Sequence, residues 1–427
     1  MKVTCFLSLL FLCMTMSAQS TFDTYFNGKR LRIDFALSGN IKTQSAALVQ
    51  LREEPVWEGP RKNLIEPFDY GGYTLHAYDK ASGNMIFSYG FNTLFEEWRT
   101  TDQAKTETQS WTNSVKMPFP LNPITVTLLG RNRSINIKDT LLTLEIDPSS
   151  IFIDRSKLND NPVVDIQVKG EPSGKVDIAF VAEGYSASEK DKFFDDAKRF
   201  AEALLATPPF DQCRDDFNIR AVYLESKDSG TDFSGKGVFL NTALNSGFYT
   251  FGTERYLTTP DMKSVCDAVW NVPCDAIFVL VNSKVYGGGG MYNFYAIGTA
   301  DNESTIQVFV HEFGHSFAGL ADEYFYSETS YSDFYNLKYE PWEPNITTLV
   351  DFDSKWKDMM PAGTPVPTPL EAPYADKTGV FEGAGYASKG IYRPMDHCMM
   401  HDLKSFCPVC SRAILRMVDY RSDRKIR

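Results

Sequence analysis

The stretch His-Glu-Phe-Gly-His-Ser-Phe-Ala-Gly-Leu-Ala-Asp-Glu-Tyr occupies residues 311–324 and decides how the second half of the chain is interpreted. An apolar segment, residues 305–310, precedes it. Ser304 is in position to cap a helix there, and Gln307 follows three residues later. Apolar residues surround both histidines, so we expect a helix that is buried inside a domain.

His311 and His315 lie four residues apart, which places both imidazoles on one face of that helix. Neutral imidazole nitrogens bind zinc at about 2.0–2.1 Å, and a catalytic zinc site uses three protein ligands and a water. Glu312 can reach that zinc-bound water and take its proton without binding the metal. The alternative is a pair of core histidines beside an exposed glutamate. Because the chain has only 5 histidines, this spacing favours a metal site.

The third ligand is expected just after the helix, which Gly319 can end in a left-handed conformation. Asp322 follows three residues later. This arrangement is similar to the long motif of metzincin zinc peptidases, in which the third ligand lies three residues after a glycine. Here the glycine comes one residue later than in that motif. By this comparison Asp322 is the third ligand, and a carboxylate is an accepted zinc ligand. The open alternatives are Glu323, a glutamate on a distant helix (Glu340 or Glu343), and His397 or His401.

A methionine-rich segment precedes the last predicted helix, residues 407–420. Metzincins place a tight methionine turn beneath the metal, just before the C-terminal helix. Met400 fits that position best, with Met399 and Met395 as alternatives. A methionine that fills a gap in the core is the other interpretation.

The fold class predicted from the sequence is α+β with two domains. Residues 20–150 are predicted to form an antiparallel β-sandwich, because apolar and polar residues alternate in short segments separated by glycine-containing turns. These segments are 31–37, 73–78, 85–91, 124–129 and 141–146. His76 is expected on a strand face. Residues 151–165, rich in Pro, Asp and Asn, are the predicted linker.

Residues 166–427 are predicted to form an α/β domain with a mixed sheet, because strands alternate with helices. The expected strands are 176–182, 217–224 and 276–281, and the expected helices are 186–205 and 260–269. A capping box of Ser186 and Glu189 begins the first of these helices. The glycine run 287–290 lacks the Lys-Ser/Thr ending of a phosphate-binding loop. We expect it to lead into an exposed edge strand, residues 294–297, that can pair with an extended peptide.

The chain begins with a predicted secretory signal peptide, residues 1–18, cleaved near Ala18. Cys13 leaves a lipid-anchored form as the alternative. No later segment has 18 consecutive apolar residues, so we predict no transmembrane segment. The expected location is the periplasm, the cell surface or the medium.

Six cysteines follow this peptide, and export favours disulfides between them. They are Cys213, Cys266, Cys274, Cys398, Cys407 and Cys410, and their pairing is open. The alternatives are free thiols or a structural zinc site. Cys407 and Cys410 would form half of that site, completed by Cys398 with His397 or His401.

The composition excludes some classes of function. The formal net charge is −12, whereas a nucleic-acid-binding surface needs clustered Lys and Arg to neutralise phosphates. The chain holds 31 Phe, 21 Tyr and 6 Trp, which is too much apolar surface for a globally disordered protein.

The sequence resembles the IgA peptidase family of secreted bacterial zinc metallopeptidases, a metzincin-like group. The resemblance rests on residues 311–324, Val-Ala-Glu-Gly-Tyr at 181–185, Phe-Asn at 217–218, Cys-Met-Met at 398–400 and Phe-Cys-Pro-Val-Cys at 406–410. It covers about residues 165–427, and the preceding β-rich segment looks like that family's N-terminal accessory domain. The resemblance implies one catalytic zinc ion, with His311, His315 and Asp322 as ligands and Glu312 as the base.

We therefore expect a secreted zinc-dependent endopeptidase that binds protein or peptide substrates as an extended strand. Glu312 would deprotonate the attacking water and return the proton to the leaving amine, while Tyr324 or His401 would stabilise the oxyanion. The alternatives are a non-proteolytic zinc amidase, an inactive binding protein of the same fold, and an adhesin that binds through its β-domain. The immunoglobulin specificity in the family name is not carried over, because pocket shape decides the substrate. The oligomeric state is left open.

Overall fold

The computed structural model describes residues 21–132, 135–326 and 334–427. The predicted signal peptide lies outside these residues. Within the described ranges, no helix is long and apolar enough to cross a membrane.

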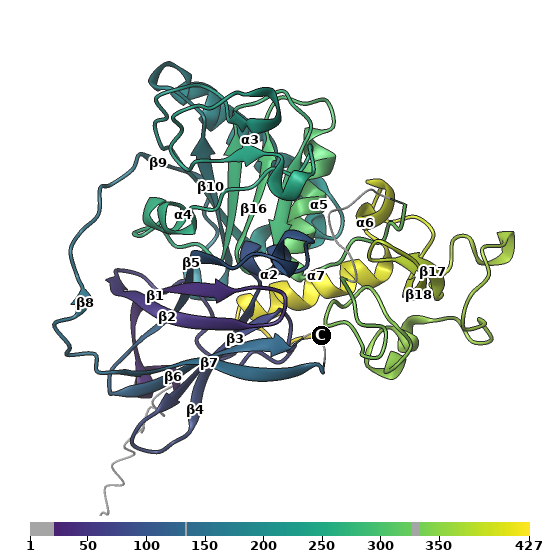
Figure 1. Cartoon of the computed structure of the whole chain (residues 1–427), viewed down its shortest axis with the longest axis horizontal. Coiled ribbons are helices and arrows are strands. Elements are labelled where there is room, and N and C mark those ends of the chain that lie inside the picture. Colours follow the sequence, from purple (N-terminus) through teal and green to yellow (C-terminus); the bar gives the residue numbers. More distant parts are fainter. Residues whose placement is uncertain (1–20, 133–134, 327–333) are drawn as a thin grey trace, which may run out of the picture.

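The N-terminal part contains two four-stranded sheets (Figure 1). Their strand orders are β5-β1-β2-β8 and β4-β3-β6-β7, and all pairs are antiparallel except β2 with β8. Alternate side chains of both sheets meet in one apolar cluster, as Ile33 of β1, Leu75 of β3 and Val126 of β6 do. The elements of this part are α1 (Thr21–Tyr25), β1 (Phe26–Gly39), β2 (Gln44–Glu54), β3 (Tyr73–Asp79), β4 (Met85–Phe91), α2 (Leu94–Trp98), β5 (Gln109–Pro120), β6 (Ile124–Asn132), β7 (Ile137–Ile146) and β8 (Ile153–Asp154).

The C-terminal part is built on a six-stranded mixed sheet of order β15-β16-β14-β10-β11-β9. The four inner strands are parallel, and both edge strands are antiparallel to their neighbours. The elements of this part are β9 (Val163–Gln167), β10 (Val176–Glu183), α3 (Lys190–Ala206), β11 (Phe217–Val222), β12 (Asp232–Phe233), β13 (Gly247–Phe248), α4 (Met262–Ala268), β14 (Ala276–Val281), β15 (Gly288–Met291), β16 (Tyr295–Thr299), α5 (Thr305–Ala318), β17 (Phe381–Ala384), β18 (Ala387–Arg393), α6 (Met399–Asp402) and α7 (Pro408–Arg421).

The edge strand of this sheet differs from the prediction. Residues 294–297 do not form the edge, because β16 pairs with β14 on one side and β15 on the other. The glycine run itself supplies the edge strand β15. A strand without large side chains has no hydrophobic alternation, so it cannot be predicted from the hydrophobic pattern of the sequence.

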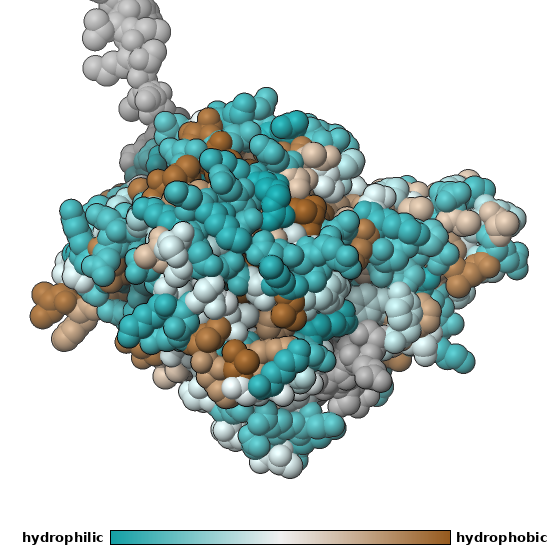
Figure 2. Space-filling view, turned by 90° about the horizontal axis from the view of Figure 1, so that it is seen from above, coloured by the Kyte–Doolittle hydropathy of each residue, from teal (hydrophilic) through white to brown (hydrophobic). Residues whose placement is uncertain are grey.

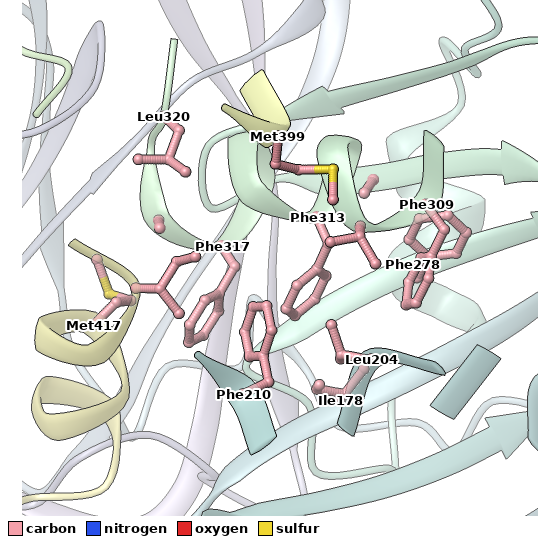
Figure 3. Packing of buried hydrophobic residues seen from close by; sticks show 14 of the residues in the cluster. Ile178, Leu204, Phe210, Phe278, Phe309, Phe313, Phe317, Leu320, Met399 and Met417 are labelled. Carbon is pink, nitrogen blue, oxygen red and sulfur yellow. The ribbon is translucent and has the colours of Figure 1, made fainter. Parts of the chain in front are cut away.

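Helices cover both faces of the mixed sheet. Ile178 and Phe180 of β10 point to the face that carries α3, α5 and α7, while the alternate residues Ala179 and Val181 face the cluster that includes α4. Figure 3 shows Phe309, Phe313 and Phe317 of α5 in the first of these clusters. The strongly apolar helix α5 is therefore held on the sheet by its phenylalanines, and its remaining face is left to the functional side chains.

Helix α7 lies between the mixed sheet and the N-terminal strands in Figure 1. Just after α7, the Asp423 carboxylate accepts backbone N–H groups of Arg61 and Lys62 at 2.7 and 2.9 Å. Arg30 of β1 is fully buried, pairs with Glu54, and donates to the backbone carbonyls of Val269 and Trp270. Polar contacts, those of Arg30 among them buried, thus join the two parts of the chain.

The predicted disulfides are not present. All six cysteines of the described residues are unpaired and buried. The face of the molecule in Figure 2 is mostly hydrophilic and shows hydrophobic side chains in small groups.

Candidate active site

Helix α5 ends at the predicted residue. Gly319 adopts φ +64°, and its N–H bonds to the His315 carbonyl at 3.1 Å. A side chain there would be strained and would also meet the ring of Trp342 at 2.9 Å. At the other end Ser304 is the N-cap residue, but its side chain makes no capping bond, contrary to the expectation. The chain reverses sharply after Gly319 and returns over the helix face that carries the histidines.

This reversal brings together the three residues predicted as metal ligands. The Nε2 atoms of His311 and His315 lie 3.0 Å apart, and Asp322 Oδ1 lies 3.0 and 3.3 Å from them. Zinc bonds of 2.0–2.1 Å in a tetrahedron separate neighbouring ligand atoms by about 3.3 Å. The three atoms therefore have the spacing of three corners of a zinc tetrahedron.

Backbone carbonyls orient both imidazoles. His311 Nδ1 lies 3.0 Å from the carbonyl oxygen of Met399, and His315 Nδ1 lies 2.6 Å from that of Leu320. Since a carbonyl only accepts, each Nδ1 carries a proton, and in the neutral imidazole each Nε2 then presents a lone pair to the shared point.

Charge is unevenly distributed at this point. Burial opposes ionisation of Asp322, but contacts with His315 and His311 hold its pKa well below the usual range. Burial alone would lower the pKa of His315, yet the carboxylates of Asp322 and Glu312 raise it to about 9. The carboxylates of Asp322 and Glu312 thus stabilise positive charge on the histidine that they face.

Glu312 is partly exposed and lies beside the histidines, within the cavity wall. One of its carboxylate oxygens and a ring nitrogen of each histidine all lie within 4.8 Å of one another. Burial raises the pKa of Glu312. A carboxylate so placed can exchange a proton with a group held at the shared point.

Met400 lies beneath α5. It is fully buried, and its Sδ packs against Gly314 in the middle of the motif. Its backbone carbonyl accepts the N–H of Glu323 at 2.8 Å. Met399 contributes the carbonyl that holds His311, so both methionines support the helix.

The other candidates for the third ligand make contacts elsewhere. Glu340 accepts the N–H of Asp351 at 2.9 Å, and Glu343 accepts the Tyr335 hydroxyl at 3.1 Å. His397 pairs with Asp402 at 2.6 Å, and His401 Nδ1 lies 2.6 Å from the carbonyl of Asp396. Glu323 is fully buried and faces Cys410.

The sequence did not indicate two residues beside Asp322. The Tyr386 hydroxyl, on the turn between β17 and β18, donates to Asp322 Oδ2. Arg255 places its guanidinium 5.8 Å from the ring centre of Tyr324, which also lines the site. Tyr386 is 64 positions from Asp322, so no local spacing identifies it.

A cavity of about 510 Å³ opens over the motif. Its wall includes Glu312, Tyr324, His401 and the edge strand β15. A Cβ on Gly290 of β15 would lie only 2.3 Å from the carbonyl oxygen of Glu312, so strand and helix are in direct backbone contact. Asn92 and Glu97 also line the cavity, so the N-terminal part contributes to the site.

Comparison with known families identifies the group. The family described as IgA Peptidase M64 matches residues 164–373 and 370–418, and the family described as Peptidase M64 N-terminus matches residues 21–141. The chain belongs to the IgA peptidase M64 family. It is accordingly a peptidase, a hydrolase that acts on peptide bonds, and the family points to a metallopeptidase. The search among curated proteins gave no match.

Proposed function

We propose that this M64 peptidase is an exported, zinc-dependent endopeptidase. His311, His315 and Asp322 would hold one zinc ion, and Glu312 would act as the general base. The main support for this proposal is that His311 Nε2, His315 Nε2 and Asp322 Oδ1 lie 3.0–3.3 Å from one another.

The chemistry of these atoms fits a cation. In the neutral imidazoles both Nε2 atoms present lone pairs, because their Nδ1 partners are carbonyls. Asp322 Oδ1 is buried and faces the two Nε2 atoms at 3.0 and 3.3 Å. Three electron-rich atoms so close together repel one another unless positive charge lies between them. Imidazole and carboxylate are both zinc ligands, and three protein ligands leave the open position of a catalytic site.

Each residue then has a defined task. A zinc ion bound here supplies Lewis acidity and lowers the pKa of a water in the open position. Glu312 takes the proton of the attacking water and delivers it to the leaving amine, and its raised pKa suits both transfers. The cavity position of Tyr324 and His401 supports either of them as the donor to the oxyanion.

The shape of the site supports an extended substrate. β15 is an edge strand of the mixed sheet and lines the cavity along the motif. A peptide added as a further strand would run past Glu312, with Asn92 and Glu97 on the wall of the cavity. Tyr256 already forms an isolated bridge with Gly288, the first residue of β15. We therefore propose that the substrate strand pairs with the part of β15 that follows Gly288.

We also propose that the chain is organised as the sequence predicted, with domains at 20–150 and 166–427 and a linker at 151–165. The last strand of the N-terminal sheets, β8, ends at Asp154, and the first strand of the mixed sheet, β9, begins at Val163. The passage between the two parts therefore falls inside the proposed linker, which supports the division. Met400 under α5 and the C-terminal helix α7 support a metzincin-like architecture.

The decisive experiment compares the wild-type chain with Glu312→Gln and with Glu202→Gln, a control at an exposed site on α3. Zinc content is measured by mass spectrometry, and hydrolysis with a panel of fluorogenic peptides and denatured proteins. We expect zinc in all three proteins and a rate lower by about 10²–10⁴-fold in Glu312→Gln alone. A wild-type rate in Glu312→Gln would exclude Glu312 as the base, and absence of zinc after metal-replete purification would overturn the ligand assignment.

A further inference from the structure

A second cluster of metal-binding side chains lies behind the first. Glu323, Cys398, Cys407 and Cys410 are all buried, and one potential ligand atom of each lies within 4.8 Å of all the others. The residues come from three segments: the loop after α5, the start of α6, and the first turn of α7. None of the four is among the proposed ligands of the catalytic zinc.

The spacing within this cluster matches a metal site. Cys398 Sγ and Cys410 Sγ lie 3.7 Å apart, and Glu323 Oε1 lies 3.2 Å from Cys410 Sγ. Zinc–sulfur bonds of about 2.3 Å in a tetrahedron separate two sulfurs by about 3.8 Å. Three thiolates and one carboxylate complete a four-coordinate site with no position left for water, which is the pattern of structural zinc.

The backbone stabilises thiolates at these positions. The N–H of Cys407 points to Cys398 Sγ and that of Cys410 to Cys407 Sγ, both at 3.4 Å. Cys407 is the N-cap of α7, and Cys410 follows in the first turn, where the helix dipole favours negative charge. The Cys-Pro-Val-Cys spacing of these two residues is the usual half of a zinc knuckle.

The buried carboxyl group of Glu323 is separate evidence for a cation in this cluster. Its Oε2 is buried and has no hydrogen-bond partner among the described residues. Within the part of the chain that the structure describes, Asn345 donates to Oε1 of this carboxyl group at 2.9 Å and the Cys410 thiol donates to the same oxygen at 3.2 Å. A buried carboxyl group aimed into three sulfurs is costly unless a cation compensates it.

A disulfide accounts for these groups less well. To form a disulfide, Cys398 Sγ and Cys410 Sγ would have to approach from 3.7 Å to about 2.0 Å. Any one disulfide would also leave the third thiol and the carboxyl group of Glu323 buried together. A bound metal ion, in contrast, would contact all four side chains.

We propose that Glu323, Cys398, Cys407 and Cys410 bind a second, structural zinc ion. Zinc fits this mixed set because it accepts both thiolate and carboxylate ligands in a tetrahedron. The ion would cross-link the loop that carries Asp322, the segment that holds His311 through the Met399 carbonyl, and helix α7. It would thus fix the frame around the catalytic centre without taking part in the reaction.

The first test is zinc stoichiometry of the full mature chain, purified with zinc and without chelator. We expect two zinc ions per wild-type chain, one in Cys410→Ser, one in His315→Ala and two in Cys213→Ser, a buried cysteine outside the cluster. Two zinc ions in Cys410→Ser, or one in the wild type with none in His315→Ala, would overturn the proposal.

Two measurements on the wild type avoid dependence on a variant that fails to fold. With cobalt in place of zinc, we expect a sulfur-to-cobalt charge-transfer band in the near ultraviolet. The catalytic site has no sulfur ligand, so this band reports the second site alone, even if the catalytic assignment is wrong. Denaturation with a chelator and no reductant should expose six alkylatable thiols. Absence of the band, or only four reactive thiols because a disulfide has formed, would refute the proposal.

Discussion

Replacing Gly290 by alanine tests whether the edge strand β15 sets the position of Glu312. The added Cβ would lie 2.3 Å from the Glu312 carbonyl oxygen, 3.0 Å from the carbonyl carbon and 3.1 Å from His315 Cβ. Contacts of a Cβ below 3.0 Å are essentially never seen, and the nearest obstacle is rigid backbone. Strand and helix must therefore separate by about 0.7 Å or more, because a close-packed interior offers no void to absorb the methyl group.

This displacement acts directly on the turn of α5 that carries Glu312, the proposed base. Forcing one extra methyl group into a packed contact costs about 1–3 kcal/mol of folding free energy. A misplacement of about 1 Å in a reacting group can cost about 100-fold in rate. For a shift of about 0.7 Å we expect kcat/KM to fall between about 10- and 100-fold, mainly through kcat, together with a lower Tm.

The assay is steady-state hydrolysis of a fluorogenic peptide, with zinc content and Tm measured on the same samples. Gly174→Ala is the matched control, because its Cβ would meet nothing within 4 Å. We expect this control to keep the wild-type rate and Tm. If Gly290→Ala also keeps the wild-type kcat/KM, the close contact between β15 and α5 does not position Glu312, and the reasoning fails.

Three further predictions follow from single contacts. Tyr386→Phe removes the hydroxyl that donates to Asp322, so we expect zinc affinity at the catalytic site to fall about 10–100-fold in competition with a chromophoric chelator; unchanged affinity would contradict a supporting role. Trp356→Ala removes a fully buried indole whose Nε1 donates to the Gly379 carbonyl at 2.8 Å, so urea unfolding should show a loss of about 3–5 kcal/mol, and a loss under 1 kcal/mol would contradict tight packing there. Removing metal with a strong chelator should abolish peptide hydrolysis and added zinc should restore it, whereas activity that persists in verified metal-free enzyme would exclude a catalytic metal.

The sequence was most informative where function depends on short spacings. The helix around His311 and His315 and its end at Gly319 follow from rules that span four residues or fewer. Asp322 could be reached from the same helix, because only a short loop separates them. The apolar strands β10 and β14 were also predicted, since their buried runs have a clear pattern.

Contacts made by tertiary folding could not be predicted in this way. Tyr386 reaches Asp322 across 64 positions, and Asn92 reaches the cavity from the other half of the chain. The edge strand β15 was missed because glycines carry no hydrophobic alternation. Strands β2 and β5 were missed because polar residues interrupt the hydrophobic alternation of their sequences. In each of these cases the position of the residue or strand depends on distant parts of the chain that pack against it, and the local sequence does not show them.

The two carboxylates that follow α5 connect these observations. Asp322 faces the histidines, while its neighbour Glu323 faces the cysteines. The segment is held by the Glu323 N–H on Met400 and by the Asp322 carbonyl, which accepts the N–H of Gly385. A shift of Glu323 therefore displaces Asp322 through one shared peptide unit. Two metal sites joined in this way would explain why a fully buried glutamate, unsuited to an apolar core, stands next to the proposed third ligand.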